Sequence, residues 1–363
     1  LSFRTMTRLT VISGIGRAVT LGAAAELLAA APGWVAVTHC LDHVEVGLVS
    51  RTVLWPSGHA DAAVVDLQHG CVSCTLREDV LPALVEFSQR SDVGGVALVL
   101  PEAVEPMSFL EAFYSVVLDE AGRTASDHLA IDCVVAVVDA ERLIPRLAVG
   151  ERLADVGLAI GDDDDRTLAE LIVEQVETAD VILTSSATDA ELTVLSLLNP
   201  DARCATTLSE GGEQLFDWER TLDRVNRARP AAMAGEVAHR GAWGFTWLSD
   251  RPFHPGRLHG CLEDLGLALR GRGTVHLASR PDVSVEWDSV GSRIALGACP
   301  AHGYAGVTAV SFVGVNGLEG AIRSRLADAT LSDAEMAAGP HEWRTWPDPF
   351  SDVWQAHIDQ EDV

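Results

Sequence analysis

Continuous apolar runs alternate with helix-like stretches through the first two thirds of the chain. Runs that are apolar at every position, rather than at every second one, are typical of strands buried on both faces of a parallel sheet. Helical stretches between such strands indicate an α/β fold with helices on both faces of a mostly parallel sheet. We expect strands at Leu9–Gly14, Trp34–Thr38, Ala62–Asp66, Val96–Leu100, Ile131–Asp139 and Val181–Thr184, and helices at Thr20–Ala31, Leu76–Phe87, Phe109–Leu118, Thr167–Thr178 and Ala190–Leu198.

The pattern changes after a polar connector that contains arginine and proline. Beyond it short strands follow one another, with helices expected on one side of them, which is typical of a small α+β domain. The predicted organisation is an N-terminal extension at 1–8, a first domain at 9–216, a linker at 217–235 and a second domain at 236–363. In the second domain we expect strands at Trp243–Trp247, Thr274–Ala278, Val283–Trp287, Arg293–Leu296 and Val307–Val313, and helices at Pro255–Leu269 and Leu318–Ala327.

Polar or glycine residues follow the expected strands of the first domain at Gly14, His39, Glu102 and Asp139. Ligands of parallel α/β sheets bind at the carboxyl ends of the strands, so these residues are candidates for a ligand site. Glu102 and Glu105 are read preferably as solvated carboxylates, with a role as an acid as the alternative.

Two cysteines three residues apart stand between a strand-like and a helix-like run, with His69 just before them. Thiolates are favoured at a helix N-terminus, and two sulfurs at the spacing of Cys71 and Cys74 can share one tetrahedral Zn²⁺. One such pair is half of a zinc site, so the other ligands must come from elsewhere. The alternative is a pair of partly buried thiols without a metal.

Composition narrows the classes of function. The chain has 363 residues, 48% of them hydrophobic, and a formal net charge of −27. This charge argues against direct binding to nucleic acid and leaves room for a protein partner with a basic face. All 26 basic residues are arginine, so no mechanism that needs a lysine is available. The seven cysteines are scattered, which argues against a disulfide framework, and Cys133, Cys204, Cys261 and Cys299 are read as structural.

No apolar run reaches the roughly 18 residues of a membrane span and no secretory signal pattern is seen, so a cytoplasmic location without membrane contact is expected. The acidic run Gly161–Asp165 is read as a solvated loop that caps the following helix. Isolated histidines in the second domain are more often structural than ligands, and this reading applies to His254, His259, His276 and His302.

Several motifs in the order found here resemble the CobW family, P-loop GTPases of the CobW/HypB/UreG type that are associated with metal insertion and zinc homeostasis. The resemblance runs from about Leu9 to Phe350. It includes the glycine turn after the first strand, the turn Gly70–Arg77 and the run Arg251–Leu258. It implies a P-loop-type sheet followed by a CobW C-terminal α+β domain. The family's Gly-Cys-x-Cys-Cys stands here as Gly-Cys-Val-Ser-Cys.

The nucleotide motifs depart from those of the family. A working phosphate loop needs Gly-x-x-x-x-Gly-Lys-Ser/Thr, because its N–H groups cradle the phosphates, its lysine bridges them and its hydroxyl holds Mg²⁺. Val19 stands where the lysine should be, and Ser185–Thr188 replaces the guanine-reading Asn-Lys-x-Asp. GTP hydrolysis at a useful rate is therefore not expected, and no catalytic residue is assigned. If GTP·Mg²⁺ binds, the resemblance implies contacts at Gly14, Gly16, Arg17, Thr20 and Asp139.

The metal motifs are closer to the family. Its acidic switch segment corresponds to Thr38–Gly47, where histidine and cysteine add ligands that zinc prefers over carboxylate. Taken alone, each histidine is read preferably as a loop residue bonded to backbone, and for Cys40 a core thiol at the strand end is an equal alternative to a ligand. The predicted zinc ligands are Cys71 and Cys74 with one or two of His69, His39, Cys40, His43 and Glu45.

The Cys-Val-Ser-Cys turn and the altered phosphate loop are similar to the actinobacterial Mrf-like branch, which recruits a ribosome hibernation factor under zinc limitation. This resemblance implies a zinc-responsive adaptor whose partner is a hibernation factor on the ribosome, or alternatively a zinc-client protein. A GTP-dependent zinc metallochaperone is the second reading. A scaffold relic that acts through protein contacts alone is the third.

Overall fold

The computed structural model describes residues 6–208, 215–231, 236–298 and 306–351. The chain forms two compact units. Unit 1 comprises Leu1–Ala140, Glu151–Ser186 and Asp201–Leu222, and unit 2 comprises Glu141–Gly150, Ala187–Pro200 and Asp223–Val363. The segments Glu141–Gly150 and Ala187–Pro200 thus belong to unit 2, although they lie within residues 9–216 of the sequence.

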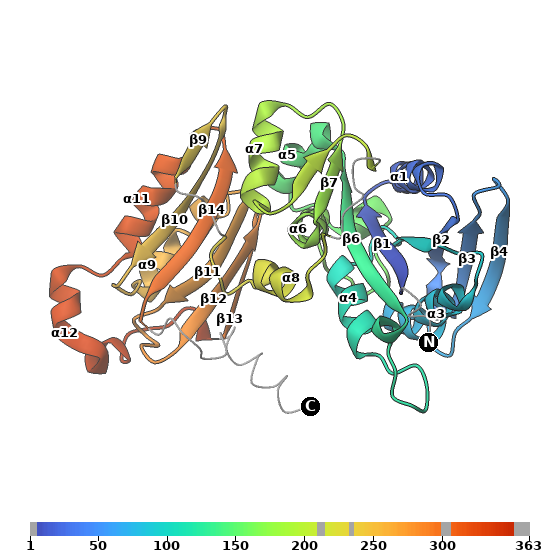
Figure 1. Cartoon of the computed structure of the whole chain (residues 1–363). Coiled ribbons are helices and arrows are strands. Elements are labelled where there is room, and N and C mark those ends of the chain that lie inside the picture. The colour runs from blue at the N-terminus through green and yellow to red at the C-terminus, as the bar shows by residue number, and fades with distance from the viewer. Residues whose placement is uncertain (1–5, 209–214, 232–235, 299–305, 352–363) are drawn as a thin grey trace. The chain divides into compact units, whose positions relative to one another are not determined.

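Unit 1 is built on one mixed sheet, with strand order β4-β3-β2-β5-β1-β6-β7-β8 (Figure 1). The strands from β2 to β8 in this order are parallel, and β3 and β4 form an antiparallel ribbon at one edge. The predicted α/β class with a mostly parallel sheet is confirmed. The strands are β1 Thr7–Gly14, β2 Trp34–His43, β3 Leu48–Leu54, β4 Ala60–Asp66, β5 Gly95–Val99, β6 Leu129–Val138, β7 Val181–Thr184 and β8 Arg203–Ala205.

Helices cover both faces of this sheet. Alternate residues of each central strand point to opposite faces, so Val11 of β1 joins one apolar core and Ile12 joins another. The first core packs under α3 and α4, and the second packs under α1. The helical segments of unit 1 are α1 Arg17–Ala30, η1 Val44–Val46, α2 Val72–Thr75, the π turn η2 Leu76–Val80, α3 Leu81–Gln89, α4 Pro106–Ser115, η3 Ala125–Asp127, η4 Leu153–Val156, α6 Leu168–Thr178 and α8 Trp218–Val225, which runs into unit 2.

Unit 2 contains a second, antiparallel sheet with strand order β13-β12-β11-β14-β10-β9. Its α+β character agrees with the sequence, but helices lie on both faces: α9, α10 and α11 pack on one core, and α7 lies against β10 and β14. The strands are β9 Val237–His239, β10 Ala242–Ser249, β11 Arg270–His276, β12 Ser284–Val290, β13 Arg293–Ala298 and β14 Thr308–Val315. The helices are α5 Ala140–Ala148, α7 Asp189–Leu198, α9 Pro255–Gly260, α10 Leu262–Leu265, α11 Glu319–Ala329 and α12 Asp333–Trp343.

Two expectations for local structure are wrong. The single helix expected over Pro255–Leu269 is two short helices that break at Cys261 and end at Gly266, before β11 begins at Arg270. The acidic run is not a fully solvated cap. Asp164 is bonded to Arg166, and α6 is capped by Thr167, whose hydroxyl accepts the N–H of Glu170.

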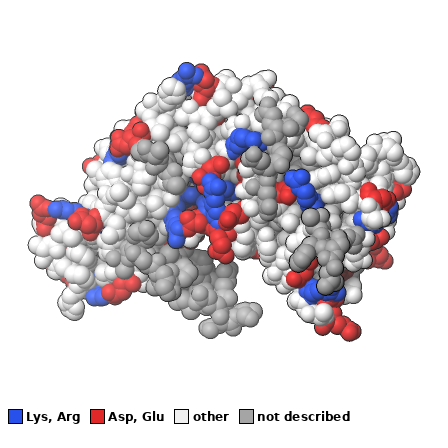
Figure 2. Space-filling model, viewed as in Figure 1, with Lys and Arg blue, Asp and Glu red and all other residues white. Residues whose placement is uncertain are grey.

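Many of the arginines visible in Figure 2 lie beside acidic side chains. The chain has 53 acidic and 26 basic residues, so many carboxylates have no arginine to pair with and the net charge stays negative. None of the helices in the described part of the chain has the length and apolarity needed to cross a membrane.

Candidate zinc and phosphate-loop site

The turn between β1 and α1 depends on two glycines in the left-handed region. Gly14 has a φ of 154°, and a Cβ there would lie 2.6 Å from the carbonyl oxygen of Val137 on β6. Gly16 has a φ of 114° and caps α1. A side chain is strained at both positions, so the sheet and the helix meet here through bare backbone. This geometry leaves the first N–H groups of α1 directed at the end of the sheet.

The carboxylate of Glu102 accepts hydrogen bonds from those N–H groups. Its Oε1 accepts hydrogen bonds from the N–H of Gly16 at 2.6 Å and from the N–H of Arg17 at 3.1 Å. Carboxylates are stabilised at a helix N-terminus by the partial positive charge of the helix. The preferred reading of Glu102 as a solvated carboxylate is therefore wrong. Glu102 thus occupies the N–H groups of Gly16 and Arg17.

Of the other residues expected to contact a phosphate, Thr20 is hydrogen-bonded within the turn and Arg17 is exposed. The hydroxyl of Thr20 is buried and donates to the carbonyl oxygen of Arg17 at 3.1 Å. Val19, where the resemblance leads one to expect a lysine, is 51% exposed and offers no charge. Arg17 is exposed and lines the neighbouring cavity, so it is the one cation of this turn that can reach a bound anion.

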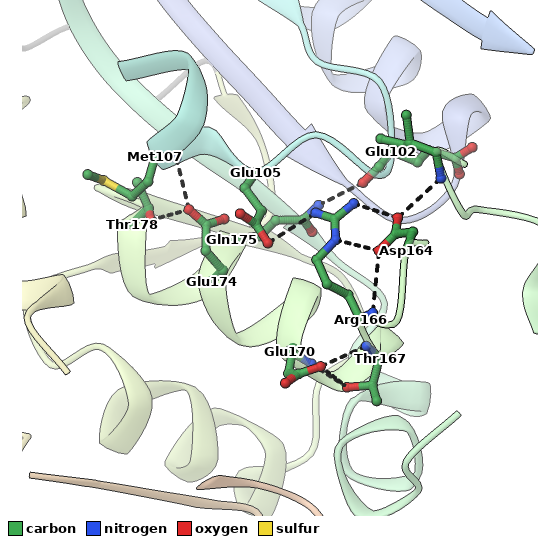
Figure 3. Close-up of polar contacts among 11 residues, drawn as sticks. Glu102, Glu105, Met107, Asp164, Arg166, Thr167, Glu170, Glu174, Gln175 and Thr178 are labelled. Atoms are coloured by element: carbon green, nitrogen blue, oxygen red, sulfur yellow. Dashed lines mark hydrogen bonds and ion pairs between the residues drawn. The ribbon is translucent and has the colours of Figure 1, made fainter. Parts of the chain in front are cut away.

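The segment that carries Glu102 is anchored on α6 (Figure 3). The carbonyl oxygen of Glu102 accepts from Gln175 Nε2 at 3.2 Å, and the N–H of Met107 donates to Glu174 Oε1 at 2.9 Å. Between them Glu105 accepts from Arg166 Nη1 at 3.1 Å, which corrects its reading as a solvated carboxylate. Three separate contacts therefore hold this segment, and Glu102 with it, in place.

Arg166 completes this anchor through a bidentate pair with Asp164. Both hydrogen bonds are 2.8 Å, and they hold the pKa of Asp164 down to about 2. The paired geometry is the strong form of an arginine–carboxylate contact. The loop before α6 is thus tied to the segment after β5 through one guanidinium group.

Glu174 gives this anchor a pH dependence that can be measured. Glu174 is half-buried, its Oε2 is buried without a hydrogen-bond partner in the described structure, and desolvation raises its pKa to about 8. The folded state therefore binds the proton more tightly than the unfolded chain does between about pH 5 and about pH 8. The free energy of unfolding should fall as the pH rises through this window, by at most about 1.4 kcal/mol per pH unit. Glu174→Gln should remove that slope in urea unfolding experiments.

The matched control is Glu111→Gln, which changes an exposed glutamate of α4. It should keep the slope of the wild type. An equal slope in wild type and Glu174→Gln would show that Glu174 titrates normally in the folded protein.

Two cavities adjoin these loops in unit 1. The first has a volume of about 400 Å³ and lies at the carboxyl ends of the parallel strands, where Arg17, Thr20, His39, Glu45 and Glu102 are among the residues that line it. The second has a volume of about 560 Å³ and is lined by the cysteine turn, by α4 and by Arg166. Ala103 and Ile160 belong to the walls of both cavities.

The cysteine turn forms the start of a helix. Cys71 is the N-cap of α2, and its Sγ accepts the N–H of Cys74 at 3.0 Å. Both thiols are partly buried and free. The hydrogen bond with Cys71, followed by burial, raises the pKa of the Cys74 thiol to about 11. Cys74 is therefore a protonated thiol at neutral pH, and a metal bound there must displace its proton.

The same turn packs tightly on the segment that carries Glu45. A Cβ at Gly70 would lie 2.1 Å from the carbonyl oxygen of Val44 and 2.8 Å from that of Glu45. Only glycine permits this approach, which explains the residue before Cys71. The cysteine turn and η1 are consequently one packed structure.

His39 has a different environment from the other candidates. It is buried, and its Nε2 lies 2.7 Å from Asp79 Oδ2, while Asp79 Oδ1 accepts from Arg51 at 2.7 Å. Its Nδ1 is buried and has no hydrogen-bond partner in the described structure. A carboxylate behind a histidine is the usual way to orient a metal ligand, so Nδ1 is the nitrogen that could bind. Asp79 was not singled out in the sequence, although it shares the buried face of its helix with Leu76 and Val80.

The remaining candidates are spread over the surface of these loops. His43, Glu45 and His69 are exposed, Cys40 is half-buried on β2, and Asp139 is exposed after β6. In the described ranges no three histidine, cysteine or acidic side chains are close enough to hold a metal ion together. The donor chemistry of Cys71 and Cys74 suits zinc, but the structure supplies these two ligands without a third. The rest of the predicted ligand set stays a prediction.

Three histidines of unit 2 make contacts that support its structure. His254 caps α9 through Nδ1 and stacks on Trp346, His259 packs on Phe350, and the Nε2 of His276 contacts the carbonyl oxygen of Pro281. Among the other cysteines, Cys133 and Cys261 are buried and Cys204 is exposed. Cys299 and His302 lie outside the described residues.

The class of this protein follows from comparison with known families. Residues 45–198 match the nucleotide-binding domain of CobW/HypB/UreG proteins, and residues 242–330 match the C-terminal domain of the cobalamin synthesis protein CobW. The chain belongs to the CobW family. The first of these matches begins after the Gly14–Thr20 turn.

Two curated relatives are similar over most of their length. A zinc-regulated GTPase metalloprotein activator of Dictyostelium discoideum is 25% identical over 79% of this chain and 70% of its own. A zinc chaperone of Mycobacterium tuberculosis is 29% identical over 88% of this chain and 87% of its own. Among solved structures, the zinc-bound YjiA GTPase of E. coli aligns with 90% of this chain and 99% of its own, at 15% identity and a TM-score of 0.39.

Proposed function

We propose that this chain is a zinc-binding, zinc-responsive adaptor on a CobW scaffold, which acts through a protein partner and not through GTP hydrolysis. The observation that carries the proposal is the Glu102 carboxylate on the N–H groups of Gly16 and Arg17. An anion already held at this position competes directly with a phosphate. The chain has no lysine to offset the added charge.

The zinc part of the proposal is supported by the cysteine turn and by the zinc-related names of the two relatives. Cys71 and Cys74 would hold the ion as thiolates. Zinc favours four ligands, so two bonds from this turn leave positions for a mobile side chain of the chain or for a ligand of the partner. Such an incomplete site suits an ion that is sensed or passed on.

The test is a calorimetric titration of the purified protein with GTP·Mg²⁺, with and without one equivalent of Zn²⁺. We expect no heat of nucleotide binding in either condition, because Glu102 occupies the loop. Micromolar binding that appears with zinc would overturn the adaptor and establish a working nucleotide site.

A second candidate, a GTP-dependent zinc metallochaperone, has its own support. The cavity of about 400 Å³ at the carboxyl ends of the strands has the size of a small-molecule site, and Thr20 and Arg17 line it. In this reading a zinc-linked movement of the 101–107 segment would withdraw Glu102. The same titration decides between the two.

The partner is the finer part of the proposal. The resemblance of the cysteine turn to the Mrf-like branch supports a ribosome hibernation factor, and a zinc-client protein is the alternative. Capture of ribosomes or of that factor with the tagged chain from zinc-starved cells, but not from zinc-replete cells, is the expected result. Recovery of neither, with zinc binding intact, would leave the zinc-client reading. A metal-free protein whose cysteine variants behave as wild type would leave only a scaffold relic.

A further inference from the structure

The free edge of β4 is a long, regular and largely apolar strand edge. All seven residues of β4 pair with β3 without a register shift, and in the described structure no strand pairs with its other side. Every residue of β4 except Val65 is exposed, and Val64 is 70% exposed. The opposite edge of the same sheet is the three-residue strand β8, so only the β4 edge is long enough to pair with several residues of another chain.

Natural proteins usually protect such an edge with charged side chains, most often lysine, or with a proline, a bulge or a short strand. The two charges of β4 are Asp61 and Asp66, near its ends. The sequence of β4, Ala-Asp-Ala-Ala-Val-Val-Asp, contains neither lysine nor proline, and its pairing shows no bulge. Its unpaired N–H and C=O groups are therefore available as a template for one more strand. The outward face of the ribbon, where Leu48 and Val64 are exposed, adds apolar surface beside that template.

The acidic side chains near β4 indicate what kind of segment could pair with its free edge. Asp61 and Asp66 stand near the two ends of β4, five residues apart and therefore on opposite faces of the strand. Asp61 already accepts a hydrogen bond from Trp55 Nε1 at 2.7 Å and lies 2.8 Å from His59 Nε2, but its side chain stays 57% exposed. Asp42 and Glu45 are exposed on the neighbouring β2 end and η1 turn. The arginine of the ribbon, Arg51, is turned inward and bonded to Asp79. Figure 2 shows acidic side chains, with basic ones beside them, on the part of unit 1 where Figure 1 draws this ribbon.

We propose that β4 binds an extended segment of a partner protein that adds to the sheet as a further strand and carries two cationic residues five positions apart. The spacing matches Asp61 and Asp66 in either strand direction. A second copy of this chain is a poor occupant, because pairing two β4 edges would bring the same carboxylates together in a protein of net charge −27. Binding of a strand to β4 does not require zinc, so it can be tested independently of the proposed zinc function.

The test uses a synthetic probe peptide with alternating valine and threonine and with arginines five residues apart. It is titrated against the full chain in EDTA, by fluorescence anisotropy at low salt. We expect saturable binding below about 1 mM. Binding should weaken at least tenfold for Val64→Arg and for Asp66→Arg, and should be unchanged for Val117→Arg, a matched control at a valine that is 59% exposed elsewhere in unit 1.

Two further probes separate strand pairing from charge alone. The same peptide with alternate backbone nitrogens methylated should not bind, and a peptide with glutamates in place of the arginines should bind Asp66→Arg better than wild type. Equal binding of the methylated peptide, equal binding to all variants, or no binding at 1 mM would overturn the proposal. A concentration-dependent dimer that Val64→Arg abolishes would also overturn it, because the edge would then belong to a second copy.

Discussion

Replacing Cys71 and Cys74 together by serine is expected to reduce zinc binding from about one equivalent to none. The two thiols are the only soft ligands that the structure places on one turn in the described ranges, and a serine hydroxyl is a poor ligand for zinc. The variant should still fold, because serine is a favourable N-cap and can accept the N–H that Cys71 Sγ now accepts. Stability should change by less than about 1 kcal/mol. Zinc content after dialysis, measured by mass spectrometry, gives the result.

Cys204→Ser is the matched control, since Cys204 is exposed on β8 and lies apart from the cysteine turn in the sheet order. It should bind zinc as wild type does. Full zinc occupancy in the double variant would place the metal elsewhere and remove the cysteine turn from the proposed site.

Replacing Glu102 by alanine is expected to free the phosphate loop. Two charge-assisted hydrogen bonds are lost, which should lower the free energy of unfolding by about 1.5 to 3 kcal/mol. The N–H groups of Gly16 and Arg17 then become available, and pyrophosphate or GTP·Mg²⁺ should bind with a dissociation constant on the order of 1 mM. Without a lysine the affinity should stay weak and hydrolysis absent. Calorimetry of both ligands against wild type and variant measures the change.

Glu105→Ala provides the comparison, because it breaks the contact with Arg166 and leaves Glu102 on the loop. It should lose stability without gaining an anion site. If Glu102→Ala binds no more pyrophosphate than wild type does, the Glu102 carboxylate is not what prevents an anion from binding to this loop.

The sheet could be predicted from the sequence because its central strands are buried on both faces. Val35 to Val37 of β2 and Val96 to Leu98 of β5 are apolar at each position, which marks them without knowledge of their neighbours. The strand β3 was missed, since it is buried at Val49 and Val53 and exposed at Leu48 and Ser50, and its polar residues obscure the run. The unit to which a segment such as α7 belongs could not be predicted, because packing partners far away in sequence decide it.

The site was predictable only where its residues are neighbours in sequence. The spacing of Cys71 and Cys74 already indicates one helical turn, and the structure agrees. Glu102 is 86 residues from Gly16, and their contact depends on β1 and β5 being adjacent in the sheet. An acidic residue directly after a central strand was the available signal. Its role as an internal anion required the three-dimensional arrangement, as did the contact between Asp79 and His39.

The wall shared by the two cavities has a thermodynamic consequence. Ala103 follows Glu102 on the anchored segment, and Ile160 lies on the loop tied to it through Asp164 and Arg166. A ligand that displaces this wall from one side alters the cavity on the other side. The two occupancies are then linked, and reciprocity requires each to change the affinity of the other by the same factor. A molecule bound beside the cysteine turn would thus change the affinity for a ligand at the strand ends, without direct contact between the two ligands.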